Sequence, residues 1–329
     1  MAVSYVYKST NSQDKLNNLY TSKDPNDILN FYKNFDNTDE LIKWMERRPK
    51  AKVKYFEEDG DTDAVVVILT KDHNSKRAIM CKDIYKGQKI VFVQSNGKYF
   101  NYASSSNKGI QYALKFKPKF VILSNDDMFK IDDIKKLKKE LQLCNPQKYK
   151  IIFANGFAHH AYQSFIGKGR FWLTAYRYLR SKTFREYQKD IDKFNITLYY
   201  QLQFNYISKV FFSMFFKPIT KFYCTGAFSI FSSNFIRELG GRLFDETYIN
   251  GLEDVDLSVR LKPEFYKFIN FSIGTLGGQS LGVDFSRKLR DVANLTYFNH
   301  KILNGGLHND IRGYAPYKPF ARAVPSAAS

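Results

Sequence analysis

The chain has 329 residues, enough for one large domain or two ordinary ones with a sizeable buried core. Its formal net charge is +19, so we expect an anionic partner: nucleotide phosphates, a lipid surface, an acidic glycan or nucleic acid. Three widely spaced cysteines, Cys81, Cys144 and Cys224, exclude a disulfide framework and a zinc-binding pattern. The first residues lack the apolar core of a signal peptide, which favours a cytoplasmic location.

Residues 1–62 are polar and contain two helix-start signals, one at 22–28 and one at 37–42. In each, a capping residue precedes acidic and then apolar positions, which is typical of a helix N-terminus. The segment carries no pattern that indicates chemistry. We predict an N-terminal helical extension that packs against the main domain.

Residues 63–154 alternate between apolar β-branched runs and helical patterns. The predicted strands are 64–70, 89–94 and 120–124, and the predicted helices are 76–84 and a segment that begins at Asn107. Strands with apolar residues at every position are buried on both faces, and such an alternation requires crossover connections. The pattern therefore predicts an α/β fold with a doubly wound, mostly parallel sheet, and ligands of such sheets bind at the carboxyl ends of the strands.

The ends of these three strands carry polar side chains. The third end is the most informative, because Asp126 and Asp127 are adjacent carboxylates that repel each other unless a cation lies between them. Oxygen ligands without nitrogen or sulfur suit Mg²⁺ or Mn²⁺. An ordinary turn is the alternative interpretation. The other two ends present Thr70 and Asp72, and then Gln94 and Asn96.

Residues 155–223 are crowded with Phe, Tyr, Trp, Lys and Arg. We predict a helical insertion here. Its aromatic side chains would pack on one another, lie in a membrane interface, or form a stacking surface, with nucleic acid the least favoured partner. The segment thus leads us to expect peripheral membrane contact as one option.

Residues 224–300 contain the densest acidic stretch of this basic chain. A helix is expected to start at Glu253 and Asp254, where ionised carboxylates are favoured, and Asp256 faces Arg260 four positions on. An acidic helix start is common in proteins that use it for stability alone. A strand and a glycine-rich loop (265–281) and a helix (287–300) follow, and residues 301–329 are expected to be a surface tail.

Two separated runs of this sequence resemble glycosyltransferase family 2, over about half the chain. Thr225-Gly-Ala, Gly240-Gly, Phe244-Asp-Glu and Glu253-Asp-Val-Asp-Leu with Arg260 resemble the acceptor-side signature of that family. Asn125-Asp-Asp resembles the Asp-x-Asp motif of GT-A glycosyltransferases, and Asn107-Lys-Gly matches the helix that precedes it.

The resemblance implies a GT-A fold and an inverting, metal-assisted transfer of sugar from a UDP-, GDP- or dTDP-linked donor to a glycan, lipid or protein hydroxyl. It implies Asp254 as general base and Glu253 as the residue that orients the acceptor or Asp254. It also implies Mn²⁺ or Mg²⁺ on Asp127 with Asp126. The implied donor contacts are Thr70, Asp72, Gln94, Asn96, Asn107, Gly109, Asn125 and Asp126, and the implied acceptor wall is Thr225, Gly226 and Ala227.

The sequence also departs from the family pattern. Gln94-Ser-Asn replaces the acidic end of the second strand, and no histidine lies near 275–280, where many relatives complete the metal site. A nucleotidyltransferase on a similar sheet is disfavoured, because no glycine-rich phosphate loop follows the first strand. A catalytically degenerate GT-A-fold protein that binds membrane or nucleic acid through residues 155–223 remains the alternative.

Overall fold

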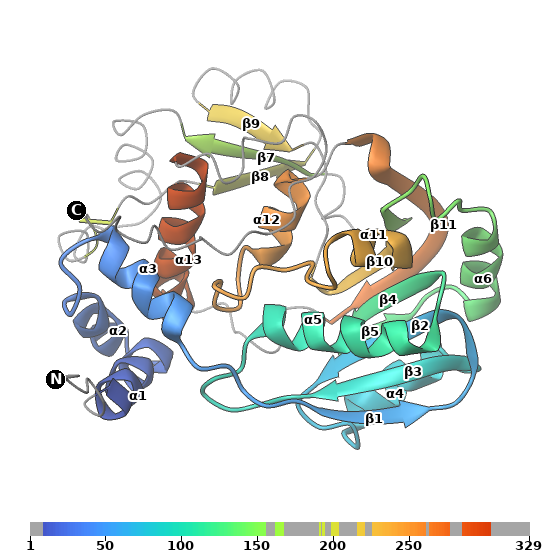
Figure 1. Ribbon diagram of the computed structural model, residues 1–329, viewed down its shortest axis with the longest axis horizontal. Coiled ribbons are helices and arrows are strands. Elements are labelled where there is room, and N and C mark those ends of the chain that lie inside the picture. Colours follow the sequence, from blue (N-terminus) through green and yellow to red (C-terminus); the bar gives the residue numbers. More distant parts are fainter. Residues whose placement is uncertain are drawn as a thin grey trace, which may run out of the picture.

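The computed structural model describes residues 9–155, 162–167, 191, 193–194, 199–203, 216–220, 226–260, 263–276 and 285–303. Within this part of the chain, an eight-stranded sheet with helices on both faces forms the main body, and a three-stranded sheet lies beside it (Figure 1). The prediction of an α/β fold is confirmed.

The helices are α1 (Ser9–Thr21), α2 (Pro25–Tyr32), α3 (Thr38–Arg47), α4 (Lys76–Ile84), α5 (Tyr102–Ala113), α6 (Ile134–Gln142), α11 (Ser233–Glu238), α12 (Glu253–Val259) and α13 (Phe285–Leu303). The strands of the large sheet are β1 (Lys54–Glu58), β2 (Asp61–Thr70), β3 (Gln88–Gln94), β4 (Phe120–Asn125), β5 (Met128–Lys130), β6 (Ile151–Asn155), β10 (Phe228–Ser232) and β11 (Tyr266–Thr275). The small sheet contains β7 (Tyr162–Gly167), β8 (Tyr199–Gln203) and β9 (Phe216–Thr220).

The strand order of the large sheet is β1-β3-β2-β4-β10-β6-β11-β5. Strands β3, β2 and β4 are parallel to one another, as are β6 and β11. Strands β1, β10 and β5 run antiparallel to their neighbours. The sheet is therefore mixed rather than mostly parallel, because the alternating pattern in the sequence covered only the three strands that are in fact parallel.

Helices cover both faces of the sheet. Residues of α4 and α6 pack with Val66 and Ile68 of β2, whereas α5, α11 and Leu257 of α12 pack with Val65 and Val67 on the opposite face. Figure 1 shows α5 crossing in front of the strands and α4 behind them. Because alternate residues of a strand point to opposite faces, the fully apolar β2 supplies both layers of the core.

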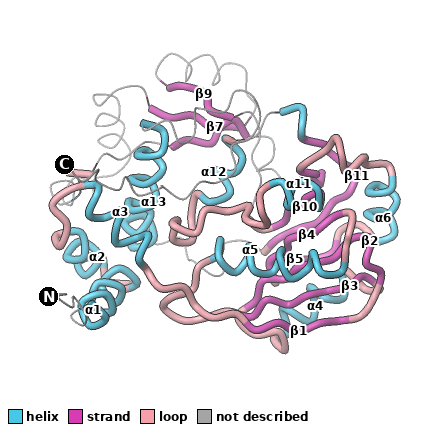
Figure 2. The backbone as a smooth tube through the Cα atoms, in the orientation of Figure 1, coloured by secondary structure: helices cyan, strands magenta, loops and turns pink. Residues whose placement is uncertain are grey.

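The N-terminal extension differs from its predicted boundary. Helices α1 to α3 end at Arg47, and β1 then joins the edge of the large sheet, so residues 54–62 belong to the main body. The helices pack against α13, with α3 and α13 side by side in Figures 1 and 2. The Tyr32 hydroxyl donates to the Leu289 carbonyl at 2.7 Å, and Tyr20 donates to Arg290 at 3.0 Å. The predicted packing role is confirmed.

Three described segments of residues 155–223 form the strands β7, β8 and β9, so the prediction of a helical insertion is wrong for these segments, whereas the described Ile191 is helical. Strand β7 pairs antiparallel with both β8 and β9. The sequence of β8, Tyr-Tyr-Gln-Leu-Gln, alternates apolar and polar residues with a period of two, which is the pattern of a half-exposed strand. The remainder of the insertion lies outside the described residues. Among the described helices, none is long and apolar enough to cross a membrane.

Candidate functional site

The carboxyl ends of β2, β3 and β4 meet at one edge of the sheet. The hydroxyl of Thr70 at the end of β2 donates to Asp126 Oδ2 beyond the end of β4, with an oxygen–oxygen distance of 2.6 Å. The Ser95 amide, after β3, donates to the Thr70 carbonyl at 3.0 Å. Parallel pairing thus brings together side chains that are far apart in the sequence, as the strand pattern predicted.

Gln94 has a partner that sequence analysis did not predict. Its Oε1 accepts the His73 amide at 3.1 Å and lies 2.8 Å from His73 Nδ1. The His73 ring stacks on Phe56 of β1 with centroids 3.5 Å apart. Asn96 donates weakly to the Lys71 carbonyl, at 3.4 Å. The stacked imidazole fixes the Gln94 amide so that its oxygen is occupied while its NH₂ group can face a ligand.

Asp72 lies on the same loop and is largely exposed. Its Oδ1 accepts the Asn74 amide at 3.0 Å, which stabilises the turn after β2. Asn125, at the end of β4, donates its amide to the Ala227 carbonyl at 2.9 Å. Of the predicted donor contacts, Thr70, Asp72, Gln94, Asn96, Asn125 and Asp126 therefore lie on the adjoining ends and loops of neighbouring strands.

Asp127 is the buried carboxylate at this edge. The residue is 8 % exposed, and its Oδ1 has no hydrogen-bond partner among the residues that the structure describes. Burial, together with the charge of Asp126, raises the pKa of the Asp127 carboxyl above its usual value. A cation placed between the two carboxylates would satisfy the unpaired oxygen and relieve the repulsion. The residues present therefore fit a divalent metal ion.

The protein supplies few ligands for such an ion. Within the described ranges, no group of three or more His, Cys, Asp or Glu side chains is placed to hold a metal. Thr275 hydrogen-bonds the Asp127 carboxyl, and the Leu276 amide donates to the Asp127 carbonyl at 3.0 Å. The segment 275–280, which lacks a histidine, thus adjoins Asp127 through its described residues Thr275 and Leu276. Water or substrate oxygens would have to complete the coordination.

The second carboxylate pair lies at the first turn of α12. Asp254 Oδ2 accepts the Gly226 amide at 3.1 Å, and its Oδ1 accepts the Val255 amide at 2.8 Å. Glu253 is 6 % exposed, and within the described part of the chain its Oε2 has no hydrogen-bond partner. The backbone before the pair is unusual, because Leu252 has a φ of 69°. A left-handed leucine costs on the order of 1 kcal/mol and is found more often at functional sites than elsewhere.

Both carboxyls of this pair hold protons more tightly than usual. Burial raises the pKa of Glu253 to about 8, and the negative charge of Asp254 adds to the shift. Burial also raises the pKa of Asp254, although the amides of Gly226 and Val255 oppose the effect. Burial therefore favours the protonated form of Glu253 at neutral pH, and Asp254, which accepts a backbone hydrogen bond on each oxygen, is the member of the pair better placed to carry the charge.

Gly226 and Ala227 connect the two acidic pairs. Gly226 donates to Asp254, and the carbonyl of the next residue, Ala227, accepts the amide of Asn125. The Tyr102 hydroxyl donates to the Gly226 carbonyl, and a Cβ on Gly226 would come within 3.3 Å of that ring. The end of β4 and the start of α12 therefore flank one short segment. Thr225, the third predicted acceptor residue, lies outside the described residues.

Asn107 and Gly109 were predicted to contact the nucleotide donor, but contacts within the protein explain why these two residue types are needed. Asn107 donates to the Phe244 carbonyl at 2.8 Å and accepts the Phe244 amide at 3.0 Å, in the middle of α5. A Cβ on Gly109 would lie 2.6 Å from Val67 and from Val93, so only glycine lets α5 approach the sheet. We leave both residues out of the binding site.

A buried ionic cluster behind α12 was missed by sequence analysis, apart from the Asp256–Arg260 pair. Lys301 Nζ lies 2.8 Å from Asp245 Oδ2 and 2.5 Å from Asp256 Oδ2, and Arg260 Nε lies 2.9 Å from Asp256 Oδ1. The Tyr297 hydroxyl donates to Asp245 at 2.8 Å. Lys301 was predicted to begin a surface tail, but α13 continues to Leu303. A lone lysine beyond a helix pattern gave no signal of this role.

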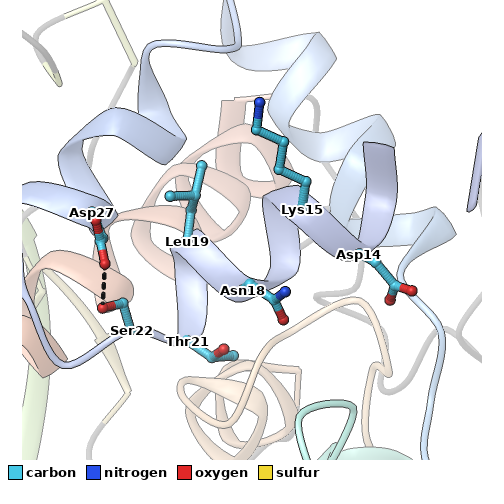
Figure 3. Close-up of a pocket in the computed structure, with 7 residues that line it drawn as sticks. All are labelled: Asp14, Lys15, Asn18, Leu19, Thr21, Ser22 and Asp27. Carbon is cyan, nitrogen blue, oxygen red and sulfur yellow. Dashed lines mark hydrogen bonds between the residues drawn. The ribbon is translucent and has the colours of Figure 1, made fainter. Parts of the chain in front are cut away.

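A surface hollow lies elsewhere, between α1 and α2. Figure 3 shows its lining, with Ser22 donating to Asp27 at 2.8 Å. The lining residues are Asp14, Lys15, Asn18, Leu19, Thr21, Ser22 and Asp27. None of them belongs to the strand ends or to α12. The hollow is therefore separate from the two acidic pairs.

No protein-family model matches the chain, and no curated protein shows significant similarity to it. The functional argument therefore depends on the geometry of the two acidic pairs.

Proposed function

We propose that this chain is a glycosyltransferase of the GT-A type, which transfers a sugar from a nucleotide-diphosphate sugar to an acceptor hydroxyl. The observation that carries the proposal is the arrangement of two adjacent carboxylate pairs on either side of Gly226 and Ala227. Each pair contains one buried oxygen, Asp127 Oδ1 or Glu253 Oε2, that has no hydrogen-bond partner among the described residues. One pair suits a metal ion and phosphates, and the other suits a proton acceptor, which are the two needs of this reaction.

The donor would lie across the carboxyl ends of β2, β3 and β4. The NH₂ group of Gln94 would donate to the base, since its oxygen is engaged by His73. Asp127 and Asp126 would hold Mn²⁺ or Mg²⁺, which when bound neutralises charge on the diphosphate leaving group. The fit rests on the unpaired oxygen of Asp127.

Asp254 would act as the general base. It carries the charge of its pair, and a pKa raised by burial brings a carboxylate closer to the value at which it accepts a proton efficiently near neutral pH. The acceptor oxygen would attack the anomeric carbon as its proton passes to Asp254. Glu253, protonated and with a free Oε2, would donate a hydrogen bond that orients the acceptor. Inversion at the anomeric carbon follows if the attack is a single displacement.

A ligand screen tests the donor half of the proposal. We expect one nucleoside diphosphate, among UDP, GDP and dTDP and their sugars, to raise the melting temperature in the presence of Mn²⁺. The shift should disappear in Asp127→Ala and persist in Asp254→Asn, because only Asp127 lies at the donor side. If no nucleotide shifts a cooperatively melting wild-type chain, the proposal is wrong and the degenerate binding protein takes its place.

A further inference from the structure

The large apolar side chains that remain exposed are concentrated at one end of the molecule. Those in the described part of the chain lie on α4, β5 and β11 or directly after β5, α6 and β11: Ile79, Met80, Phe129, Ile131, Leu143, Phe268 and Leu276. Strand β5 contacts α4 and β11, and α6 contacts β11, so these elements form one continuous region. Scattered apolar residues need no explanation, but a concentration of this kind marks a contact surface.

The outer surface of α4 and α6 is also basic. Both helices cover the same face of the sheet and bury Ala78 and Cys81, or Leu137 and Leu141, against it. Residues 71–86 contain five Lys or Arg against two Asp, and residues 130–150 contain seven Lys against three acids. We call this surface the basic apolar face, and its exposed members are Lys76, Ile79, Met80, Lys86, Lys135, Lys139 and Leu143.

Acidic side chains of the described residues do not neutralise all the positive charge of this face. Several neighbouring lysines are paired, such as Lys130 with Asp133 and Lys136 with Asp132. Lys76, Lys86, Lys135 and Lys139 form no ion pair with the described residues and are exposed. The face therefore presents uncompensated positive charge on both helices, beside Ile79 and Met80 on α4, which are 47 % and 54 % exposed, and beside Leu143 directly after α6.

The chemistry of the face selects among three kinds of partner. Interfaces between protein copies are depleted of lysine, whereas this face is rich in it. Binding of single-stranded nucleic acid relies on aromatic stacking, whereas the side chains that protrude from α4 and α6 are aliphatic. Protruding aliphatic side chains surrounded by lysines suit the headgroup region of an anionic bilayer, where the apolar groups insert and the lysines meet lipid phosphates.

We propose that the basic apolar face docks this protein on an anionic membrane surface. Strand β5 begins directly after Asp127, and the exposed Leu276 donates its amide to the Asp127 carbonyl. Docking would place the edge of the sheet that carries Asp126 and Asp127 near the bilayer. The docking itself does not depend on the proposed transferase activity, but it would give that site access to an acceptor held in the membrane.

Flotation of the full chain with lipid vesicles tests the proposal. We expect binding to phosphatidylcholine vesicles that contain phosphatidylglycerol, weak binding to pure phosphatidylcholine, and release at high salt. Replacing Lys76, Lys86, Lys135 and Lys139 by Gln should weaken the apparent affinity on the order of 1000-fold. The triple change Ile79→Ser, Met80→Ser and Leu143→Ser should weaken it on the order of tenfold.

A matched control carries four Lys→Gln changes on the opposite, N-terminal side, at the exposed Lys15, Lys23, Lys33 and Lys43. It has the same net charge as the four-lysine variant and should bind nearly as well as wild type. Equal losses in both four-lysine variants, or no binding of wild type to either vesicle, would overturn the proposal. Two other results would also overturn the proposal, if the wild type shows them without binding vesicles and the triple Ser variant loses them. One is self-association of the protein, and the other is binding to a single-stranded oligonucleotide. None of these results depends on sugar transfer, so they leave the proposed function to its own test.

Discussion

Two groups of acidic side chains lie on or near α12, and they differ in whether a basic side chain contacts them. Asp245 and Asp256 are fully buried, but Lys301 and Arg260 contact them directly. Lys301 lowers the pKa of Asp245 even though burial acts in the other direction. Among the described residues no cation contacts Glu253 or Asp254, and burial raises the pKa of both carboxyls. The compensated acids hold the helix in place, and the uncompensated acids remain available for chemistry.

The largest expected effect comes from removing the compensation. Lys301→Met leaves Asp245 and Asp256 buried beside a single arginine, so we expect the free energy of unfolding to fall by about 3–5 kcal/mol. Urea unfolding measures this change. Lys288→Met, an exposed change on the same helix, should have little effect. A Lys301 variant as stable as wild type would mean that the cluster does not hold α12.

Substitution of Asp254, in the pair without a cation, should lower the activity far more than the stability. Asp254→Asn removes the proposed general base, so we expect transfer to fall about 100- to 1000-fold. Its melting temperature should fall only slightly, because Asn can accept only one of the backbone hydrogen bonds from Gly226 and Val255, while removal of the carboxylate charge acts in the opposite direction. The measurement is release of nucleoside diphosphate with the donor found in the ligand screen. Asp39→Asn, at an exposed position, serves as control, and full activity of Asp254→Asn would exclude the base role.

Glu253 should make stability depend on pH. Its pKa rises from 4.5 unfolded to about 8 folded, so between these values the folded chain binds more protons than the unfolded chain. The free energy of unfolding therefore decreases as pH rises through this window, and the whole decrease is present above the folded pKa. Glu253→Gln removes it, so the variant should be more stable than wild type by roughly 1–3 kcal/mol at alkaline pH and equal to it near pH 4.

Thermal or urea unfolding across this pH range provides the measurement. The exposed Glu46→Gln should follow the wild-type curve. Parallel curves for wild type and Glu253→Gln would show that Glu253 is ionised in the folded chain at neutral pH, which would weaken its role as a hydrogen-bond donor to the acceptor.

The smallest expected effect concerns the other unsatisfied carboxylate. With Mn²⁺ at about ten times its dissociation constant, the nucleotide-bound wild type should gain about 1.4 kcal/mol of stability. Asp127→Asn should lose this gain, and chelation should remove it from the wild type. An equal response of Asp127→Asn and wild type to Mn²⁺ would place the metal elsewhere.

The sequence determined the local features of this protein. The apolar runs predicted β2, β3 and β4 as parallel strands, because a strand buried on both faces admits few other residues. It also indicated the polar ends of those strands, the start of α12 at Glu253, and the Asp256–Arg260 pair, since each depends on neighbours within four positions.

Only the tertiary structure decided the rest. Pairing of β10 between β4 and β6 made the sheet mixed, and it placed Ala227 against Asn125. Residues 199–203 became a strand because β7 offered an edge, and Lys301 became the partner of Asp245 because α13 runs past α12. Such contacts join residues far apart in the chain, and no periodicity or spacing in one sequence encodes which distant charge or strand will be the partner.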